Sequence, residues 1–431
     1  MKSKNTTEMT KKIHKNWVFA LCATLTVACN KDMFNEEDYK DLVEQVQPVE
    51  GIDPSHTWEL TRQYYMTVDV GNIMPEATRL QILSDNPVSS NGAIVLGDYP
   101  LSNERTQYVA FVAPSTLTTF YAALVDDADH YTVTSFTSEN RSINFYDALA
   151  IRAAVDTRQI GQQVFSYCFE DEMPVPGDYD YNDVVLRISQ ERTAYNQITL
   201  DVTLAAVGSL IQVAAAIRLI NYSYDDIESV TTLEGETFNE GYRKSALPFI
   251  ESNDLLIKGK DGGAVINLFE DAHWATGAAQ YASEGYLPRY RYNVAKMPSA
   301  DDDMVSPRTI SYAITFKNPL SLNYFTLNEL DPFVIVEFNG ALMEEHAIYR
   351  YRTVTTLHEY IQPTNAVILP WALVVPSASF RYPLDGVNIG FAKDNALFGA
   401  YMTINHAFGE WAAKAGYARD WYFYPTENMV Y

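Results

Sequence analysis

An acidic segment between two apolar runs constrains the fold of this chain more than any other part of its sequence. Residues 167–169 (Tyr-Cys-Phe) and 184–188 (Val-Val-Leu-Arg-Ile) resemble strands, and Pro and Gly residues lie between them. This order predicts two β-strands joined by an acidic loop. Within the loop, Asp178, Asp180 and Asn182 occupy every second position, so their side chains can point to one side. Oxygen ligands gathered in this way suit Ca²⁺, which takes about 6–8 of them.

The loop differs from an EF-hand. The Gly required at the sixth position of that motif is Asp183 here, and the Glu required at the twelfth is Ser189. We therefore predict a looser, structural Ca²⁺ site, in which the cation offsets the repulsion between neighbouring carboxylates. Its expected ligands are Glu170, Asp171, Asp178, Asp180, Asn182 and Asp183. The alternative is an exposed acidic turn in which Tyr179 and Tyr181 pack inward and the carboxylates face water.

The same segment closely resembles the signature of LruC-domain proteins, a family of mostly uncharacterised bacterial surface and secreted proteins. The resemblance runs from residue 161 to the C-terminus, through segments at 205–208, 225–230, 268–273, 331–333, 363–364 and 420–422. It implies a β-rich domain with a cation-stabilised acidic loop, and it implies no known reaction. Residues 357–360 (Leu-His-Glu-Tyr) depart from the E-I-H-L-like segment of the family, so this loop is expected to be remodelled.

Composition and charge exclude several classes of function. The chain has 431 residues, enough for two or three domains, and 47% of them are hydrophobic. Its net charge of −24 opposes binding to nucleic acid phosphates or to an anionic membrane face, because both need a basic surface. The chain has three cysteines, two of them in the N-terminal segment, so a disulfide framework is excluded for the mature protein.

The N-terminal segment has the features of a bacterial export signal. Lysines between residues 11 and 15 precede a short apolar core, and the small residue Ala28 stands directly before Cys29. This arrangement resembles a lipobox, so residues 1–28 are predicted to be a lipoprotein signal peptide and Cys29 the lipidated residue; a plainly cleaved signal is the alternative, and Met9 is a second candidate start. Residues 29–50 are predicted to form a flexible acidic linker. Lys31 followed by acidic residues resembles a surface-export signal, so we expect a lipid-anchored outer-membrane protein that faces the cell surface.

Beyond the linker, the sequence consists of short, strand-like runs with turn residues between them. In residues 51–160 such runs occur at 64–70, 79–83, 108–112 and 119–125, which predicts an N-terminal β-sandwich domain. Residues 161–431 are expected to form a second, larger β domain that carries the acidic loop. The predicted fold class is all-β, with two sandwich-like domains of jelly-roll or immunoglobulin-like type. A short helix is expected near residues 405–415, where apolar residues share one face.

Other reactive side chains are expected to have structural roles. Cys168 lies in an apolar run and is predicted to be a buried thiol, not a nucleophile. His273 is predicted to be a hydrogen-bonded structural residue, with a place in a second polar site as the alternative. The acidic turn at residues 126–130 is expected to be solvated. A zinc peptidase is excluded because Gln362 stands where the H-E-x-x-H motif that begins at His358 needs its second His.

These features predict a recognition protein, not an enzyme, and we assign no catalytic residue. We expect adhesion, or recognition of a glycan or protein ligand at the cell surface, with no nucleic acid partner and with membrane contact through the lipid anchor alone. The 30 tyrosines and 6 tryptophans can stack on sugars or line a protein interface. Two alternatives remain, a glycan-degrading enzyme that uses the loop carboxylates and a purely structural envelope or fimbria-associated protein.

Overall fold

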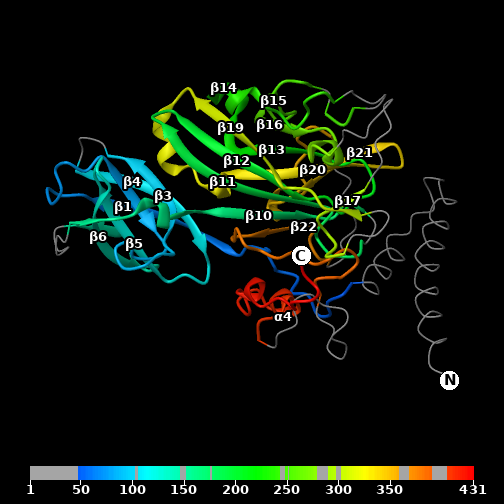
Figure 1. Ribbon diagram of the computed structural model, residues 1–431, viewed down its shortest axis with the longest axis horizontal. Coiled ribbons are helices and arrows are strands. Elements are labelled where there is room, and N and C mark those ends of the chain that lie inside the picture. Colours follow the sequence, from blue (N-terminus) through cyan, green and yellow to red (C-terminus); the bar gives the residue numbers. More distant parts are fainter. Residues whose placement is uncertain are drawn as a thin grey trace. The chain divides into compact units, whose positions relative to one another are not determined.

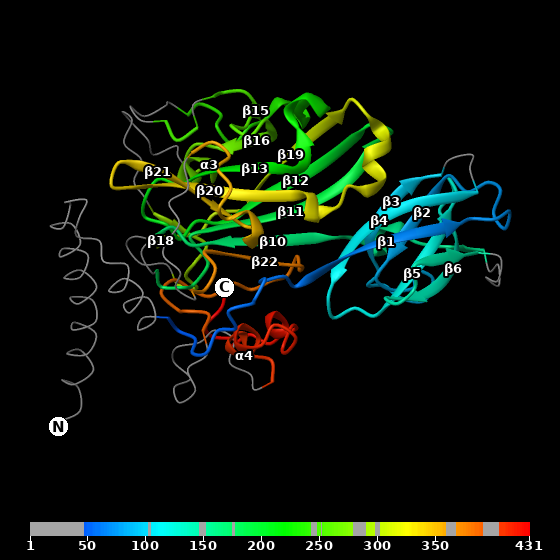
Figure 2. The same cartoon turned by 180° about the vertical axis from the view of Figure 1, so that it is seen from behind.

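The computed structural model describes residues 47–101, 105–145, 152–174, 177–242, 248–250, 252–278, 290–297, 302–358, 368–390 and 405–431. The chain divides into two compact units, and every element named below lies in the unit formed by residues 47–362 and 369–431. Figure 1 and Figure 2 show the elements from opposite sides. Among the described residues, no helix is both long enough and apolar enough to cross a bilayer.

The first part of this unit contains two sheets that enclose one apolar core. In β1 (Thr61–Asp69), alternate side chains from Tyr64 to Val68 are buried, which is the period of a strand with one face on a core. The rings of Tyr64, Phe111 and Phe120 pack there with centroids 4.9–5.2 Å apart. The other strands are β2 (Arg79–Leu83), β3 (Ile94–Pro100), β4 (Thr106–Pro114), β5 (Thr119–Val125), β6 (His130–Thr137), β7 (Ser142–Asn144), β8 (Ala153–Ala154) and β9 (Gly161–Gln162). The strand orders are β4-β1-β7 and β8-β6-β5-β2-β3-β9.

Two larger sheets follow along the chain. Their strands are β10 (Val164–Phe169), β11 (Val184–Ala194), β12 (Gln197–Ala206), β13 (Ala214–Ser223), β14 (Ile227–Thr232), β15 (Leu256–Lys258), β16 (Gly263–Phe269), β19 (Arg308–Phe316), β20 (Leu330–Phe338), β21 (Ala341–His346) and β22 (Ala372–Val375). The strand orders are β14-β19-β12-β11-β10-β22 and β15-β16-β13-β20-β21. The short strands β17 (Arg291–Tyr292) and β18 (Asp302–Asp303) form a separate parallel pair. The first seven residues of β20 are all buried, as expected for a strand covered on both faces.

The helices among the described residues are short. The α-helices are α3 (Ala272–Ala275) and α4 (Phe408–Ala413), and the 3-10 helices are η1 (Thr157–Gln159), η2 (Tyr224–Asp226), η3 (Leu233–Gly235), η6 (Pro319–Tyr324), η7 (Leu327–Glu329), η8 (Tyr349–Tyr351) and η9 (Trp421–Phe423). None of them reaches the length at which a helix is stable in isolation, so their stability comes from packing.

An aromatic cluster connects the acidic loop to the C-terminal segment. Tyr181 of the loop lies 6.5 Å from Phe408 of α4, and Trp411 lies 5.4 Å from Trp58 and 5.8 Å from Trp421 between ring centroids. All five side chains are buried. Each large aromatic side chain buries about 150–250 Å² on folding. This cluster therefore anchors the loop to parts of the chain that are far away in sequence.

The observed architecture confirms the all-β fold class. The four predicted runs between residues 64 and 125 correspond to β1, β2, β4 and β5, and the expected helix near residues 405–415 is α4. The predicted domain boundaries stay predictions, because the described structure assigns no boundary at residue 160. The predicted signal peptide, Cys29 and most of the linker lie outside the described residues, as does Gln362.

Candidate functional site

The acidic loop occupies the interval between β10 and β11, which pair in antiparallel fashion from Val164–Ser189 to Phe169–Val184. Tyr179 and Tyr181 adopt left-handed backbone conformations, with φ of 57° and 52°. Such conformations cost about 1–2 kcal/mol each in residues other than glycine. The cost is offset because both tyrosine rings are buried in one apolar core.

The carboxylate of Glu170 holds the loop in this conformation. Its oxygens accept hydrogen bonds from the backbone amides of Tyr179 at 3.0 Å and Tyr181 at 2.5 Å. Asp180 accepts from the amide of Asn182 at 3.1 Å and from that of Gly386 at 2.8 Å. These bonds explain why carboxylates can be buried here, since hydrogen bonds to the ionised form offset part of its desolvation.

The loop brings its carboxylates into two overlapping triads. Glu170, Asp178 and Asp180 form one, and Glu170, Glu172 and Asp183 form the other; in each triad, one oxygen per residue lies within 4.8 Å of the other two. Four of the six predicted ligands are thus brought together. Glu172 was not predicted, although it directly follows two predicted ligands in the sequence. Its participation depends on the turn at residues 173–174, which folds the segment back on itself.

The triads are electrostatically unfavourable without a cation. Desolvation, together with the charges of Asp171 and Asp178, raises the pKa of Glu172 to about 9. Desolvation and the neighbouring Asp385 and Asp171 raise the pKa of Asp178 to about 6. The pKa values of Glu170, Asp180 and Asp183 are also raised, by burial first and then by the surrounding carboxylates. Within the described part of the chain, no Lys or Arg forms an ion pair with any of these groups.

The other two predicted ligands, Asp171 and Asn182, lie outside the triads. The amide of Asp171 donates to Asp183 at 2.9 Å, and burial raises the pKa of the Asp171 carboxyl. Asn182 is buried and donates through Nδ2 to the carbonyl of Pro383 at 3.0 Å, while its Oδ1 has no hydrogen-bond partner among the described residues. A Cβ added to Gly208 would lie 1.9 Å from this Oδ1, so only glycine fits there.

A glycine also packs against the carboxylates themselves. A Cβ on Gly177 would lie 2.5 Å from one oxygen of Glu170 and 2.5 Å from one oxygen of Glu172. The absence of a side chain therefore lets the two carboxylates of the second triad lie directly against the backbone of Gly177. Any larger residue at this position would push the two carboxylates apart.

Two candidate reactive side chains have structural roles, as predicted. His273 is buried, with Nδ1 3.0 Å from Oδ1 of Asp271 and Nε2 2.9 Å from the carbonyl of Ser209. Cys168 is a free, buried thiol whose pKa is raised by burial to about 12. A thiol with this pKa is a poor nucleophile at neutral pH.

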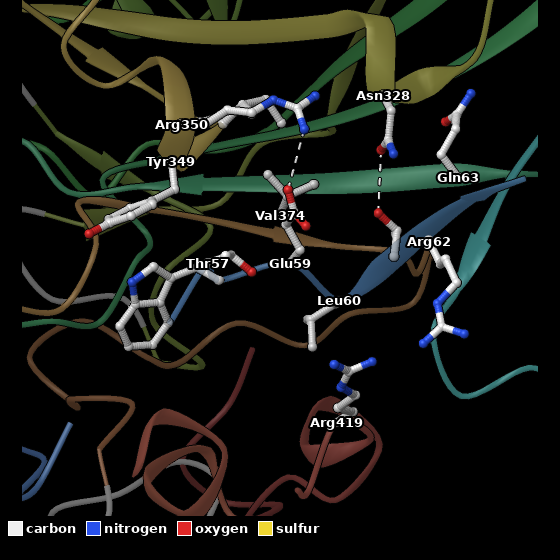
Figure 3. Close-up of a pocket in the computed structure, with 14 residues that line it drawn as sticks. Thr57, Glu59, Leu60, Arg62, Gln63, Asn328, Tyr349, Arg350, Val374 and Arg419 are labelled. Carbon is white, nitrogen blue, oxygen red and sulfur yellow. Dashed lines mark hydrogen bonds and ion pairs between the residues drawn. The ribbon is translucent and has the colours of Figure 1, made fainter. Parts of the chain in front are cut away.

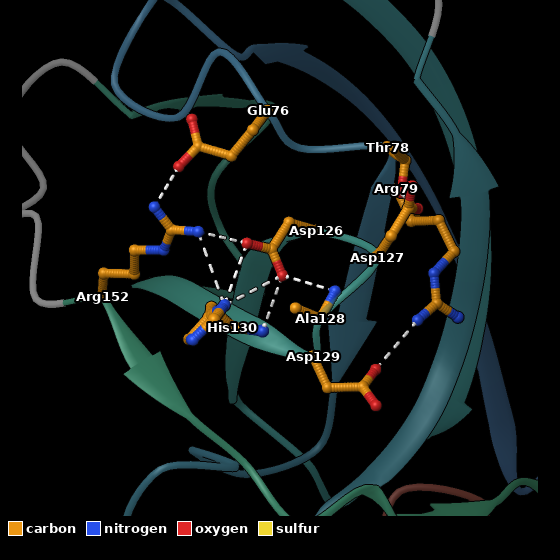
Figure 4. Close-up of polar contacts among 9 residues, drawn as sticks. All are labelled: Glu76, Thr78, Arg79, Asp126, Asp127, Ala128, Asp129, His130 and Arg152. Carbon is orange, nitrogen blue, oxygen red and sulfur yellow. Dashed lines mark hydrogen bonds and ion pairs between the residues drawn. The ribbon is translucent and has the colours of Figure 1, made fainter.

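The second acidic turn, at residues 126–130, is held together by ion pairs within the protein (Figure 4). Asp126 is buried and accepts hydrogen bonds from the amides of His130 and Ala128, each at 2.9 Å, while Arg152 bridges Asp126 and Glu76. Hydrogen bonds from His130 are the main reason that the pKa of Asp126 lies below its usual range. The prediction of a solvated turn is therefore wrong for Asp126, because its charge is satisfied internally by Arg152.

A polar pocket lies beside the edge strand β22 (Figure 3). It has a volume of about 270 Å³, and its charged lining residues are Arg62, Arg350, Arg419 and Glu59. Glu59 and Arg350 form a weak ion pair at 3.4 Å, and both side chains are exposed. The excess of guanidinium groups makes this pocket locally positive in an otherwise acidic chain. It is smaller than most small-molecule sites, which measure about 300–1,000 Å³.

The fold and the loop together define a β-sheet protein with a carboxylate-rich loop between two paired strands. The chain belongs to the family described as "Domain of unknown function (DUF4842)", whose model matches residues 195–422. The acidic loop precedes that range, so the match leaves the LruC resemblance unconfirmed. No curated protein matches the chain. A crystal structure described as a "Putative lipoprotein from Bacteroides ovatus" is similar, with 12% identity and a TM-score of 0.49 over 82% of this chain and 99% of that one; this level of similarity carries no argument about function.

Proposed function

We propose that this protein is a lipid-anchored recognition protein of the cell envelope and that its acidic loop binds Ca²⁺. The observation that carries the proposal is the pair of carboxylate triads that share Glu170. The ion would neutralise the triads and hold the loop rigid beside the aromatic cluster. Its role would be structural, and recognition of a glycan or protein partner would occur on the surface that the loop supports.

The geometry of the triads suits Ca²⁺. Ca²⁺ binds oxygen at about 2.3–2.6 Å, so two ligands of one ion lie at most about 5 Å apart. The separations within 4.8 Å meet this limit. Each carboxylate oxygen has two lone pairs, so an oxygen that accepts an amide hydrogen bond can still bind an ion. Glu170, Asp178 and Asp180 would be the ligands of the first triad, Glu170, Glu172 and Asp183 those of the second, and Glu170 would contribute to both.

A glycan-degrading enzyme is the second class to weigh. Glycosidases place two carboxyl groups about 5–9.5 Å apart across a cleft, with one of them free to transfer a proton. Here Glu170 is fully buried and already accepts two backbone hydrogen bonds, and Asp180 is held in the same way. This arrangement favours ion binding, and we propose no catalytic role for the loop.

The lipid anchor is proposed from the sequence around Cys29. A small residue directly before the cysteine and an apolar core before that are features of a lipoprotein signal peptide. We expect the wild-type chain, expressed in a Gram-negative host, to take up labelled palmitate and to fractionate with the outer membrane. The Cys29→Ser variant should do neither. Labelling that persists in this variant would disprove the anchor at Cys29.

The calcium site is tested by calorimetric titration of the full chain after removal of divalent ions. We expect saturable Ca²⁺ binding in the wild type and binding at least about tenfold weaker in Glu172→Gln, which removes one charged ligand. Asp127→Asn, in the other acidic turn, is the matched control and should bind like the wild type. Equal binding by all three proteins, or no binding by the wild type, would contradict the proposed calcium site.

A further inference from the structure

Three tyrosines that come from different segments line one groove. Tyr108 belongs to β4, Tyr195 to the turn between β11 and β12, and Tyr324 ends η6. Their exposed fractions are 59%, 64% and 44%, values that are unusual for side chains whose rings are mostly apolar. Single exposed apolar residues need no explanation, but a group of them around one concavity indicates a binding site.

The groove has the size and chemistry of a small-ligand site. Its volume is about 400 Å³, within the range of roughly 300–1,000 Å³ that is typical of such sites. Beside the tyrosines it is lined by Arg192 and Asn323. Arg192 donates to the side chain of Asn323 and to the carbonyl of Tyr195, each at 2.7 Å. These bonds fix the backbone of the turn that carries Tyr195 before any ligand arrives.

A fourth ring extends the aromatic surface. In the pairing of β1 with β4, Tyr108 lies opposite Thr67, and Tyr65 lies two residues along the same face of β1. Diagonal neighbours of this kind are about 7–8 Å apart. Tyr65 is 61% exposed. A ligand longer than the groove itself would therefore meet a further ring at this end.

We propose that this groove binds a neutral oligosaccharide. Flat, exposed rings offer apolar faces to the C–H faces of sugar rings, while phenol hydroxyls and the Asn323 amide can exchange hydrogen bonds with sugar hydroxyls. Arg192 is the one charged lining residue, and its guanidinium already donates to two groups of the protein. An acidic glycan would also be repelled by a chain with a net charge of −24. A protein partner needs about 800 Å² on each side, more than a concavity of this size presents.

The proposal rests on the proposed recognition function, but it does not require the calcium site. The test uses the full chain in excess Ca²⁺ and, separately, in chelator, with a panel of neutral gluco-, manno-, xylo- and galacto-oligosaccharides as probes. Binding is measured by calorimetry. We expect at least one oligosaccharide to bind, with affinity about tenfold or more weaker in Tyr195→Ala and in Tyr324→Ala, by analogy with other stacking sites.

Two variants separate stacking from a loss of structure. Tyr195→Phe keeps the ring and should retain most of the affinity. Tyr417→Ala removes a tyrosine that is 40% exposed outside the groove and should bind like the wild type. No binding to any oligosaccharide, or equal binding by the wild type and both alanine variants of the groove, would overturn the proposal. Sugar binding that is unchanged in chelator would support the groove as a binding site even if the titration showed no calcium binding.

Discussion

Removal of calcium is expected to lower the melting temperature of the full chain by roughly 10 °C. An ion present at 1,000 times its Kd stabilises the folded state by about 4 kcal/mol, and each kcal/mol shifts the melting temperature of a large domain by about 2–4 °C. The physical cause is that the carboxylates of the two triads repel one another when nothing cationic lies among them. The measurement is scanning calorimetry in saturating Ca²⁺ and in excess chelator.

Variants show whether the effect comes from the loop. Glu172→Gln and Asp180→Asn should each show a smaller difference in melting temperature with and without calcium than the wild type, because each removes a charge from one triad and weakens calcium binding. Asp127→Asn should keep the full difference. The calcium proposal fails if the wild type melts identically in both buffers, or if the loop variants retain the wild-type difference.

We expect the calcium-free protein to lose stability as the pH rises. The folded-state pKa values of Asp178 and Glu172, about 6 and about 9, lie above unfolded values of about 4. Their contribution to stability is therefore present below about pH 4 and is lost as the pH rises through 6 and 9, because the folded state holds protons that the unfolded state releases. In saturating Ca²⁺ this decline should be weaker, since the ion replaces those protons. Urea unfolding at several pH values, with and without calcium, measures the difference.

Replacement of His346 by Gln is expected to cost about 3–5 kcal/mol of unfolding free energy, the usual effect of breaking a buried ion pair. His346 has no exposed side-chain surface, and its ring nitrogens lie 2.7 Å from Asp331 and 3.3 Å from Glu344. Glu344 in turn accepts hydrogen bonds from the amides of Thr356, Leu357 and His358. Loss of the imidazolium would leave two buried carboxylates without their cation. It would also weaken the hydrogen bonds that attach residues 356–358 to Glu344. Urea unfolding of the wild type and the variant measures the cost.

A partly exposed ion pair between a histidine and an aspartate is the control. His406 lies 2.9 Å from Asp420, but about a third of each side chain is exposed, so His406→Gln should cost less than about 1 kcal/mol. Although burial lowers the pKa of His346, Asp331 and Glu344 raise it to about 10 on balance. The stability from this group is thus present below about pH 6.5 and is lost as the pH rises through 10. Equal losses in the two variants would contradict the assignment of His346 as a buried cation.

Local features of the fold could be predicted because they depend on neighbours in the sequence. Strand positions follow from short apolar runs, some of them alternating with polar residues, and β1, β2, β4 and β5 lie at such runs. The loop between β10 and β11 could be predicted because its acidic residues and its Pro and Gly residues are consecutive. The convergence of Asp178 and Asp180, which are two positions apart, was predictable for the same reason, whereas Asp183 belongs to the other triad. Glu172 was missed because its direction depends on the turn that follows it.

By itself, the sequence determined the all-β class, the acidic loop and its high density of negative charge. The tertiary structure alone decided that Glu170 is shared by two triads, that Arg152 satisfies Asp126, and that tyrosines from three segments line one groove. The physical reason is distance along the chain: the period of a strand is set by the backbone within a few residues. Contacts between residues farther apart in the sequence depend on how loops fold and how sheets pair and pack, and no short pattern in the sequence encodes that.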